Sequence, residues 1–145
     1  MTLEAYARQK TSASLRQLAL LLGRATQSSD ASLIIDLCTA LERFELCLFI
    51  FLRVYPHAEV KKIRRRVRKM SRLSRNVHDH DVVLAFLRQS PRRLGGQTSA
   101  TRGGELTLYD RLSQQRKLAL LSLREFIRKF HKREWSKRWR VRLGA

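Results

Sequence analysis

Acidic residues are scarce in this sequence. Only 12 of the 145 residues are Asp or Glu, against 31 Lys or Arg, which gives a formal net charge of +19. The excess is confined to one part of the chain. Residues 1–56 hold six basic and five acidic residues, whereas residues 57–145 hold 25 and seven. Because repulsion of this size opposes compaction unless anions offset it, the composition predicts a strongly negative partner.

A long apolar run, a secretory leader and a pair of cysteines that could bond are also missing. The longest apolar run, Leu46–Leu52, has seven residues and is too short to cross a membrane. The segment Met1–Ala5 lacks the basic start of a signal peptide. Cys38 and Cys47 lie nine residues apart in one expected helix, hence on opposite faces. We expect a cytoplasmic protein with reduced thiols and no membrane insertion.

Proline and glycine are few, which leaves long stretches for helices. The sequence has two prolines and six glycines, and no stretch alternates in the manner of a strand. A Gly-, Ser- and Pro-containing segment at about residues 90–106 predicts a loop. Apolar residues recur at spacings of three and four over four segments, at about residues 3–22, 31–55, 59–87 and 107–139. We predict one all-α domain over residues 1–145, built as a four-helix bundle.

A row of cations lies opposite the apolar face of the third predicted helix. At 1.5 Å per residue the row is about 21 Å long. Arginine, its main component, binds phosphate oxygens through paired hydrogen bonds, and a row suits a linear polyanion better than one small anion. A solvated helix face is the alternative; we favour anion binding because few acids are interleaved. The row consists of Lys61, Arg65, Arg68, Arg72 and Arg75, with Arg64, Lys69, Arg124, Arg128 and Lys132 as secondary candidates.

Two tryptophans lie one turn apart near the end of the fourth predicted helix. Trp135 and Trp139 are placed away from the apolar stripe that contains Ile127 and Phe130 if this helix is continuous. Packing against another helix or subunit is the favoured interpretation. Stacking on the bases of a single-stranded nucleic acid is the alternative.

A cluster of His and Asp residues raises the question of a metal site. On a helix only His78 and Asp81 of this cluster share a face, and zinc needs three or four ligands. The sequence contains no HExxH motif, no phosphate-binding glycine loop and no Ser-His-Asp order. We expect no metal, no cofactor and no catalytic activity.

Two segments resemble the CHAD (conserved histidine α-helical domain) family. Residues 74–82, Ser-Arg-Asn-Val-His-Asp-His-Asp-Val, are similar to the family's L-G-x-x-R-D-x-D-V segment. Residues 34–44, Ile-Ile-Asp-Leu-Cys-Thr-Ala-Leu-Glu-Arg-Phe, are similar to its V-H-D-L-R-V-x-x-R-R-L helix. The resemblance implies non-catalytic binding of inorganic polyphosphate in a basic cavity between two related bundles, often on polyphosphate granules. This chain resembles a divergent, single-bundle member, one half of that domain.

The match to the CHAD pattern is partial. Ile35 stands at the position of the family's histidine, and Cys38, Glu42 and His78 stand at positions of arginines. The resemblance implies that Arg43 is a surviving arginine of the anion-binding cavity. It also implies structural carboxylates that orient arginines, here Asp36, Asp79 and Asp81. Our hypothesis for the assembly is a homodimer that rebuilds the two-bundle cavity.

The sequence therefore predicts a protein that binds inorganic polyphosphate or a similar linear polyanion without catalysis. Two alternatives stay open. The same basic face could bind RNA or DNA, with the tryptophans stacking on bases. It could instead dock an acidic protein, which would make the chain an accessory subunit.

Overall fold

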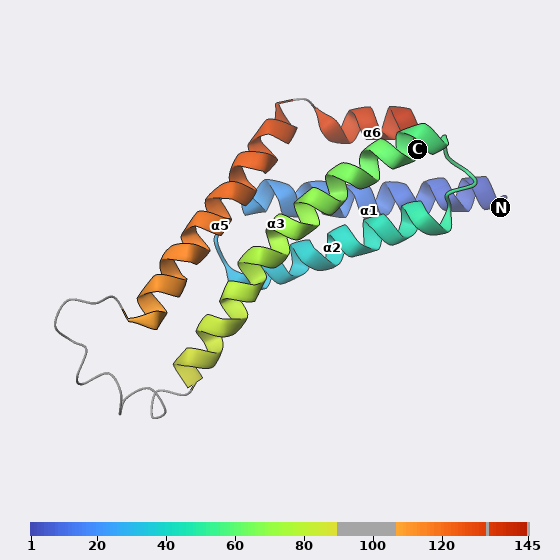
Figure 1. The fold of residues 1–145 in the computed structure, drawn as a ribbon. Helices are drawn as coiled ribbons and strands as arrows, with labels where there is room; N and C mark the ends of the chain where they lie inside the picture. The colour runs from blue at the N-terminus through green and yellow to red at the C-terminus, as the bar shows by residue number, and fades with distance from the viewer. Residues whose placement is uncertain (90–106, 133, 145) are drawn as a thin grey trace.

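The computed structural model describes residues 1–89, 107–132 and 134–144, and the regular structure in these residues is entirely helical (Figure 1). The predicted all-α class is confirmed. The loop predicted at about residues 90–106 lies outside the described residues. The helices are α1 (Leu3–Ala25), α2 (Ala31–Ile50), α3 (His57–Gln89), α5 (Leu108–His131) and α6 (Trp135–Leu143). None of them is long and apolar enough to span a bilayer.

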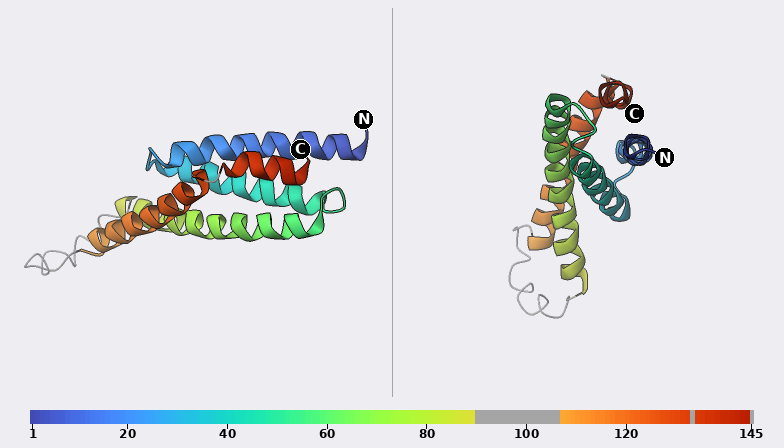
Figure 2. Two further views of the ribbon diagram at one scale, coloured as in Figure 1. Left: turned by 90° about the horizontal axis from the view of Figure 1, so that it is seen from above. Right: turned by 90° about the vertical axis from the view of Figure 1, so that its right-hand side faces the viewer.

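Successive helices pack side by side around one apolar core. α1 lies against α2, α2 against α3, and α3 against α5, while α6 lies alongside α1 and α3 (Figure 2). Each helix contributes leucines, other aliphatic residues or aromatics that are almost fully buried, such as Leu18, Leu41, Val67 and Leu123. Threonine side chains cap two helices: Thr2 accepts from the amide of Ala5 at 3.2 Å, and Thr107 caps α5. Side-chain caps of this kind fix where a helix begins.

The second helix is shorter than its sequence predicts. The expected helix over residues 31–55 ends at Ile50, and residues 51–55 form turns in which Val54 N–H donates to the carbonyl oxygen of Phe51. These turns direct Tyr55 back toward α1. Its hydroxyl donates to Thr11 Oγ1 at 2.7 Å, and both side chains are buried. A straight helix would not give this buried hydroxyl a partner, and an unpartnered buried polar group is costly.

The fourth predicted helix, at residues 107–139, is two helices. α5 ends at His131, and Glu134 adopts the left-handed region with φ of 46°, after which α6 runs back over the core. Trp139 stacks on Phe44 of α2, with ring centroids 5.7 Å apart and an interplanar angle of 1°, and it meets Phe130 edge-on at 5.8 Å. Trp135 contacts Phe130 and Trp139. Burying these rings offsets the strain of about 1–2 kcal/mol at Glu134.

The packing interpretation of the tryptophans is thereby confirmed. Trp135 is 4% exposed and Trp139 is 3% exposed. The sequence analysis placed them away from the stripe of Phe130 because it assumed one continuous helix. The reversal after α5 brings them onto that stripe instead.

We predict that Trp139→Ala lowers the free energy of unfolding by about 3–5 kcal/mol, as loss of a large buried aromatic ring does. The neighbouring Val141 is 82% exposed, so Val141→Ala serves as the control and should change stability by less than about 0.5 kcal/mol. Urea denaturation followed by far-ultraviolet circular dichroism measures both. Equal stability of the two variants would mean that α6 does not pack on the core.

Candidate functional site

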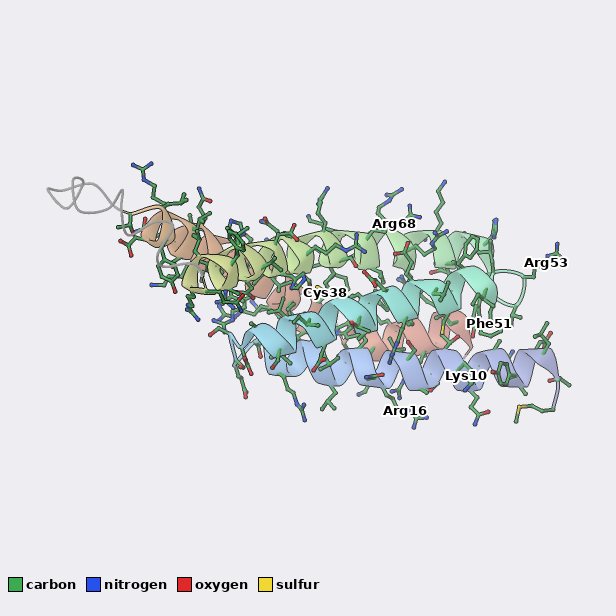
Figure 3. The ribbon with its side chains drawn as sticks, turned by 90° about the horizontal axis from the view of Figure 1, so that it is seen from below. Lys10, Arg16, Cys38, Phe51, Arg53 and Arg68 are labelled. Carbon is green, nitrogen blue, oxygen red and sulfur yellow. The ribbon has the colours of Figure 1, made fainter. Side chains whose placement is uncertain are left out.

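Burial of one face of α3 decides which of its side chains reach solvent. Val60, Ile63, Val67 and Met70 are at most 1% exposed and face the core. The cations at the remaining positions therefore project from the opposite face. Figure 3 shows Arg68 on α3 at one side of the molecule, and Lys10 and Arg16 on α1 at the other.

A groove with six cations runs beside the first half of α3, on the side of α2. Its volume is about 660 Å³, and Leu52, His57 and Val60 supply its other lining. No Asp or Glu in the described part of the chain contributes to that lining. We call it the α2-side groove, and its cations are Lys61, Arg64, Arg65, Arg68, Lys69 and Arg72.

A second hollow of about 610 Å³ continues the α2-side groove along α3. It shares Arg68 and Arg72 with the groove and extends to Arg75 and Asp79. The structure thus brings the whole predicted row of cations onto two adjoining concave surfaces. A linear ligand following α3 would pass from one to the other.

Two glutamates on α2 pair with three arginines of α3. Glu45 Oε1 accepts from Arg68 Nε at 2.8 Å and lies 3.5 Å from Arg64 Nη2. Glu42 Oε1 accepts from Arg75 Nη2 at 2.6 Å, and this hydrogen bond raises the pKa of Arg75. The expectation that few acids meet the row is wrong for these arginines, because the acids lie on the neighbouring helix and not between the cations in sequence.

The other four cations of the α2-side groove do not pair with glutamates of α2. Within residues 1–89, 107–132 and 134–144, the side chains of Lys61, Arg65 and Arg72 form no ion pair. Lys69 Nζ lies 5.1 Å from the ring centroid of Phe126 in α5. Four of the six cations in the α2-side groove therefore have no carboxylate partner among the described residues.

Four further candidates do not line either hollow. Arg124 is a structural residue, since its Nε donates at 3.1 Å to the carbonyl oxygen of Ala25 at the end of α1. This bond satisfies a carbonyl that the helix itself leaves without a partner. Arg43, Arg128 and Lys132 are exposed and lie outside the linings of the α2-side groove and its continuation.

Of the three predicted structural carboxylates, Asp81 orients an arginine, but one that the sequence analysis missed. Arg116 of α5 pairs with both carboxylate oxygens of Asp81, and its Nη2 donates at 2.6 Å to the carbonyl oxygen of Ser29. One guanidinium thus joins α3, α5 and the link between α1 and α2. Asp79 lines the continuation of the groove, and Asp36 is exposed. No local signal identifies Arg116, because its partners are 35 and 87 residues away.

The His-Asp cluster does not converge on one point. His80 Nδ1 lies 2.7 Å from the carbonyl oxygen of Asn76 on its own helix. His78 faces a small hollow of about 360 Å³ that Cys38, Glu42 and Asp79 also line. In the described ranges, no three His, Cys, Asp or Glu side chains are placed to hold a metal ion together.

Comparisons of this chain with protein-family models, curated proteins and solved structures gave no match. The similarity to the CHAD family accordingly rests on the two segments quoted above.

We predict that Arg116→Ala destabilises the protein by about 3 kcal/mol, because it leaves the mostly buried Asp81 carboxylate without its partner. Arg111→Ala, an exposed change on the same helix, is the control and should be close to neutral. Thermal and urea unfolding measure the difference. Replacing both partners, as in Asp81→Leu with Arg116→Met, should recover part of the loss; similar stabilities for Arg116→Ala and Arg111→Ala would contradict this role.

Cys38 should react slowly with alkylating agents. Burial, and next the Glu42 carboxylate, raise the pKa of Cys38 from 9.0 to about 11. The thiolate is the nucleophile, and a higher pKa leaves less of it although each thiolate is more reactive. In Cys47→Ser, iodoacetamide should modify the native protein at pH 8 about tenfold more slowly than the denatured chain. Equal rates would contradict the prediction.

The same raised pKa gives stability a pH dependence. The folded chain holds the Cys38 proton more tightly than the unfolded chain, so stability should fall as pH rises from 9.0 to about 11. In Cys38→Ser this part of the decline should be absent from urea unfolding curves.

Proposed function

We propose that this protein binds inorganic polyphosphate, or a closely similar linear polyanion, along α3 without transforming it. The observation that carries the proposal is the α2-side groove, to whose lining the described residues contribute six cations and no carboxylate. We further propose that α1, α2, α3 and the α5–α6 pair correspond to the four helices of one CHAD-like bundle. The resemblance in sequence implies the same class of ligand.

The shape of the groove favours a chain of phosphates over a single one. Lys61 and Arg72 are its outermost cations, and the 11 residue steps from one to the other rise about 17 Å along the helix. One phosphate meets two or three cations, so six cations at successive turns offer several phosphates equivalent positions. The planar guanidinium groups provide paired donors for phosphate oxygens at each position.

The ion pairs with α2 hold arginines in place without using all of their donors. Arg68 donates through Nε to Glu45, and its Nη groups have no hydrogen-bond partner in the described residues. An exposed pair of this kind contributes little to stability. Its effect is to fix the guanidinium beside the groove, which reduces the side-chain entropy that anion binding must otherwise remove.

Binding without catalysis is consistent with the residues of the groove. Among the described residues, His57 is the only imidazole in the lining, and it lies at one end of the groove. Ser, Cys, Asp and Glu side chains do not take part in the lining among the described residues. The groove therefore offers cations for binding, and it offers no nucleophile paired with a general base.

Burial of the tryptophans removes the stacking surface that the sequence offered to a single-stranded nucleic acid. Proteins that bind single strands stack bases on exposed aromatic rings. Trp135 and Trp139 are at most 4% exposed and pack in the core, so they do not provide such a platform. A phosphate chain, by contrast, needs no stacking surface.

We predict that Lys61→Glu with Arg72→Glu weakens binding of long-chain polyphosphate by about a hundredfold or more. Each substitution removes a charge-assisted contact that contributes about 1.5–3 kcal/mol. Lys10→Glu with Arg16→Glu is the matched control, because it makes the same change in net charge on exposed positions of α1, away from the groove. Fluorescence anisotropy of labelled polyphosphate measures both affinities. The affinity of the unaltered protein should also fall steeply with salt, and the double variant in the groove should show a shallower slope.

Two results would count against the proposal. Equal losses of affinity in the two double variants would mean that overall charge, and not the groove, binds the anion. If RNA of equal total charge displaced bound polyphosphate while the reverse displacement failed, nucleic acid would be the better ligand.

A further inference from the structure

Cations also cover the side of α3 that faces α5 and α6. Lys62, Arg66 and Lys69 lie about 100° further round the helix than the row that borders the α2-side groove. Two of these side chains rest on aromatic rings. The Arg66 guanidinium lies 5.3 Å from the ring centroid of Phe130, and Lys69 Nζ lies 5.1 Å from that of Phe126. Such contacts hold the cations near the surface while leaving their outer donors to solvent.

These cations border a second basic hollow, which α6 completes. Its volume is about 400 Å³, and Arg142 of α6 and Phe126 of α5 form its far wall. Next to it, Arg138 joins Arg66 and Arg142 around a small cleft over the two tryptophans. We call the larger hollow the α6-side groove, and its cations are Lys62, Arg65, Arg66, Lys69 and Arg142.

The two grooves meet on the solvent-exposed face of α3. Arg65 and Lys69 belong to the linings of both. Their side chains are exposed, and they lie one helical turn apart. No barrier of apolar or acidic side chains therefore separates the grooves at these two residues.

We propose that a long polyphosphate chain bound in the α2-side groove crosses α3 over Arg65 and Lys69 and continues into the α6-side groove. This inference rests on the proposed function and assigns it a second set of contacts, chiefly Lys62, Arg66 and Arg142. The protein then distinguishes polyphosphates by length. A short chain fills one groove, whereas a long chain occupies both.

A short chain prefers the α2-side groove because more of its cations lack a carboxylate among the described residues: four of six remain after Glu45 has paired with Arg64 and Arg68, against three of five in the α6-side groove. Glu59 lies 3.6 Å from Lys62 Nζ and 3.5 Å from Arg142 Nε, so one carboxylate already offsets two of its cations. The α2-side groove is also larger and has one more cation. The α6-side groove binds phosphate mainly when the same polyphosphate chain is already bound in the α2-side groove, because that binding raises the local concentration of phosphate.

The test compares tripolyphosphate with long-chain polyphosphate on three double variants that each change the net charge equally. Lys62→Glu with Arg66→Glu alters the α6-side groove, Lys61→Glu with Arg72→Glu alters the α2-side groove, and Lys10→Glu with Arg16→Glu is the control. Isothermal titration calorimetry gives the affinities. Relative to the control, the α6-side variant should lose about tenfold or more in affinity for the long chain and nothing for tripolyphosphate. The α2-side variant should lose affinity for both.

The other possible outcomes distinguish failure of the crossing, of the division by length and of the proposed function. If the α6-side variant matches the control for the long chain while the α2-side variant is weakened, the crossing is overturned and the proposed function stands. If the α6-side variant loses both ligands equally, the division by length is overturned. If the α2-side variant matches the control for both ligands, the proposed function itself fails.

Arg66 packs on Phe130, so its replacement can disturb the fold. Circular dichroism and thermal unfolding of every variant detect this. If the α6-side variant is unfolded, Lys62→Gln with Arg142→Gln replaces it, since both side chains are exposed and line the α6-side groove. Its loss for the long chain should be smaller and in the same direction, and no loss relative to Lys10→Gln with Arg16→Gln would overturn the crossing.

Discussion

Burial of the apolar face of α3 is the constraint on which the rest of the structure depends. Val60, Ile63, Val67, Met70 and Val77 are at most 1% exposed, and together they fix the rotation of a helix that packs against α2 on one side and α5 on the other. Once that rotation is fixed, every cation of α3 has a defined direction. Some of these cations face α2, some point to solvent between the two grooves, and some face α5 and α6. The basic surface is thus a consequence of core packing as much as of composition.

The fold accommodates this much positive charge on one helix by placing a carboxylate or an aromatic ring beside many of the cations. Glu42 and Glu45 of α2 pair with three arginines of α3, and Glu59 lies beside Lys62 and Arg142. Aromatic rings carry others, as Phe130 does for Arg66. Four cations of α3 for which the described residues supply no carboxylate line the α2-side groove, where a phosphate chain would supply counter-charge: Lys61, Arg65, Lys69 and Arg72. Under the proposed function, a bound polyanion would reduce the same repulsion between cations that the ion pairs reduce on folding.

Helical periodicity was enough to place most of the fold, and it failed where the chain changes direction. α1 and α3 agree with the predicted segments to within three residues at either end. The end of α2 at Ile50 was missed because the bond between Tyr55 and Thr11 joins residues 44 positions apart. The break before α6 was missed because no Pro or Gly marks it. Glu134 takes a left-handed conformation there, and the packing of Trp139 on Phe44 and of both tryptophans on Phe130 offsets its strain.

The sequence by itself determined the all-α class, the apolar face of α3 and the existence of a cationic row opposite it, because these follow from the spacing of residues within one helix. Only the tertiary structure decided which cations act together. It paired Arg68 and Arg75 with glutamates of α2, assigned Arg124 to the end of α1 and brought Arg142 beside Lys62. The physical reason is distance along the chain: local spacing fixes the face of a helix, whereas contacts between helices depend on how their buried faces pack.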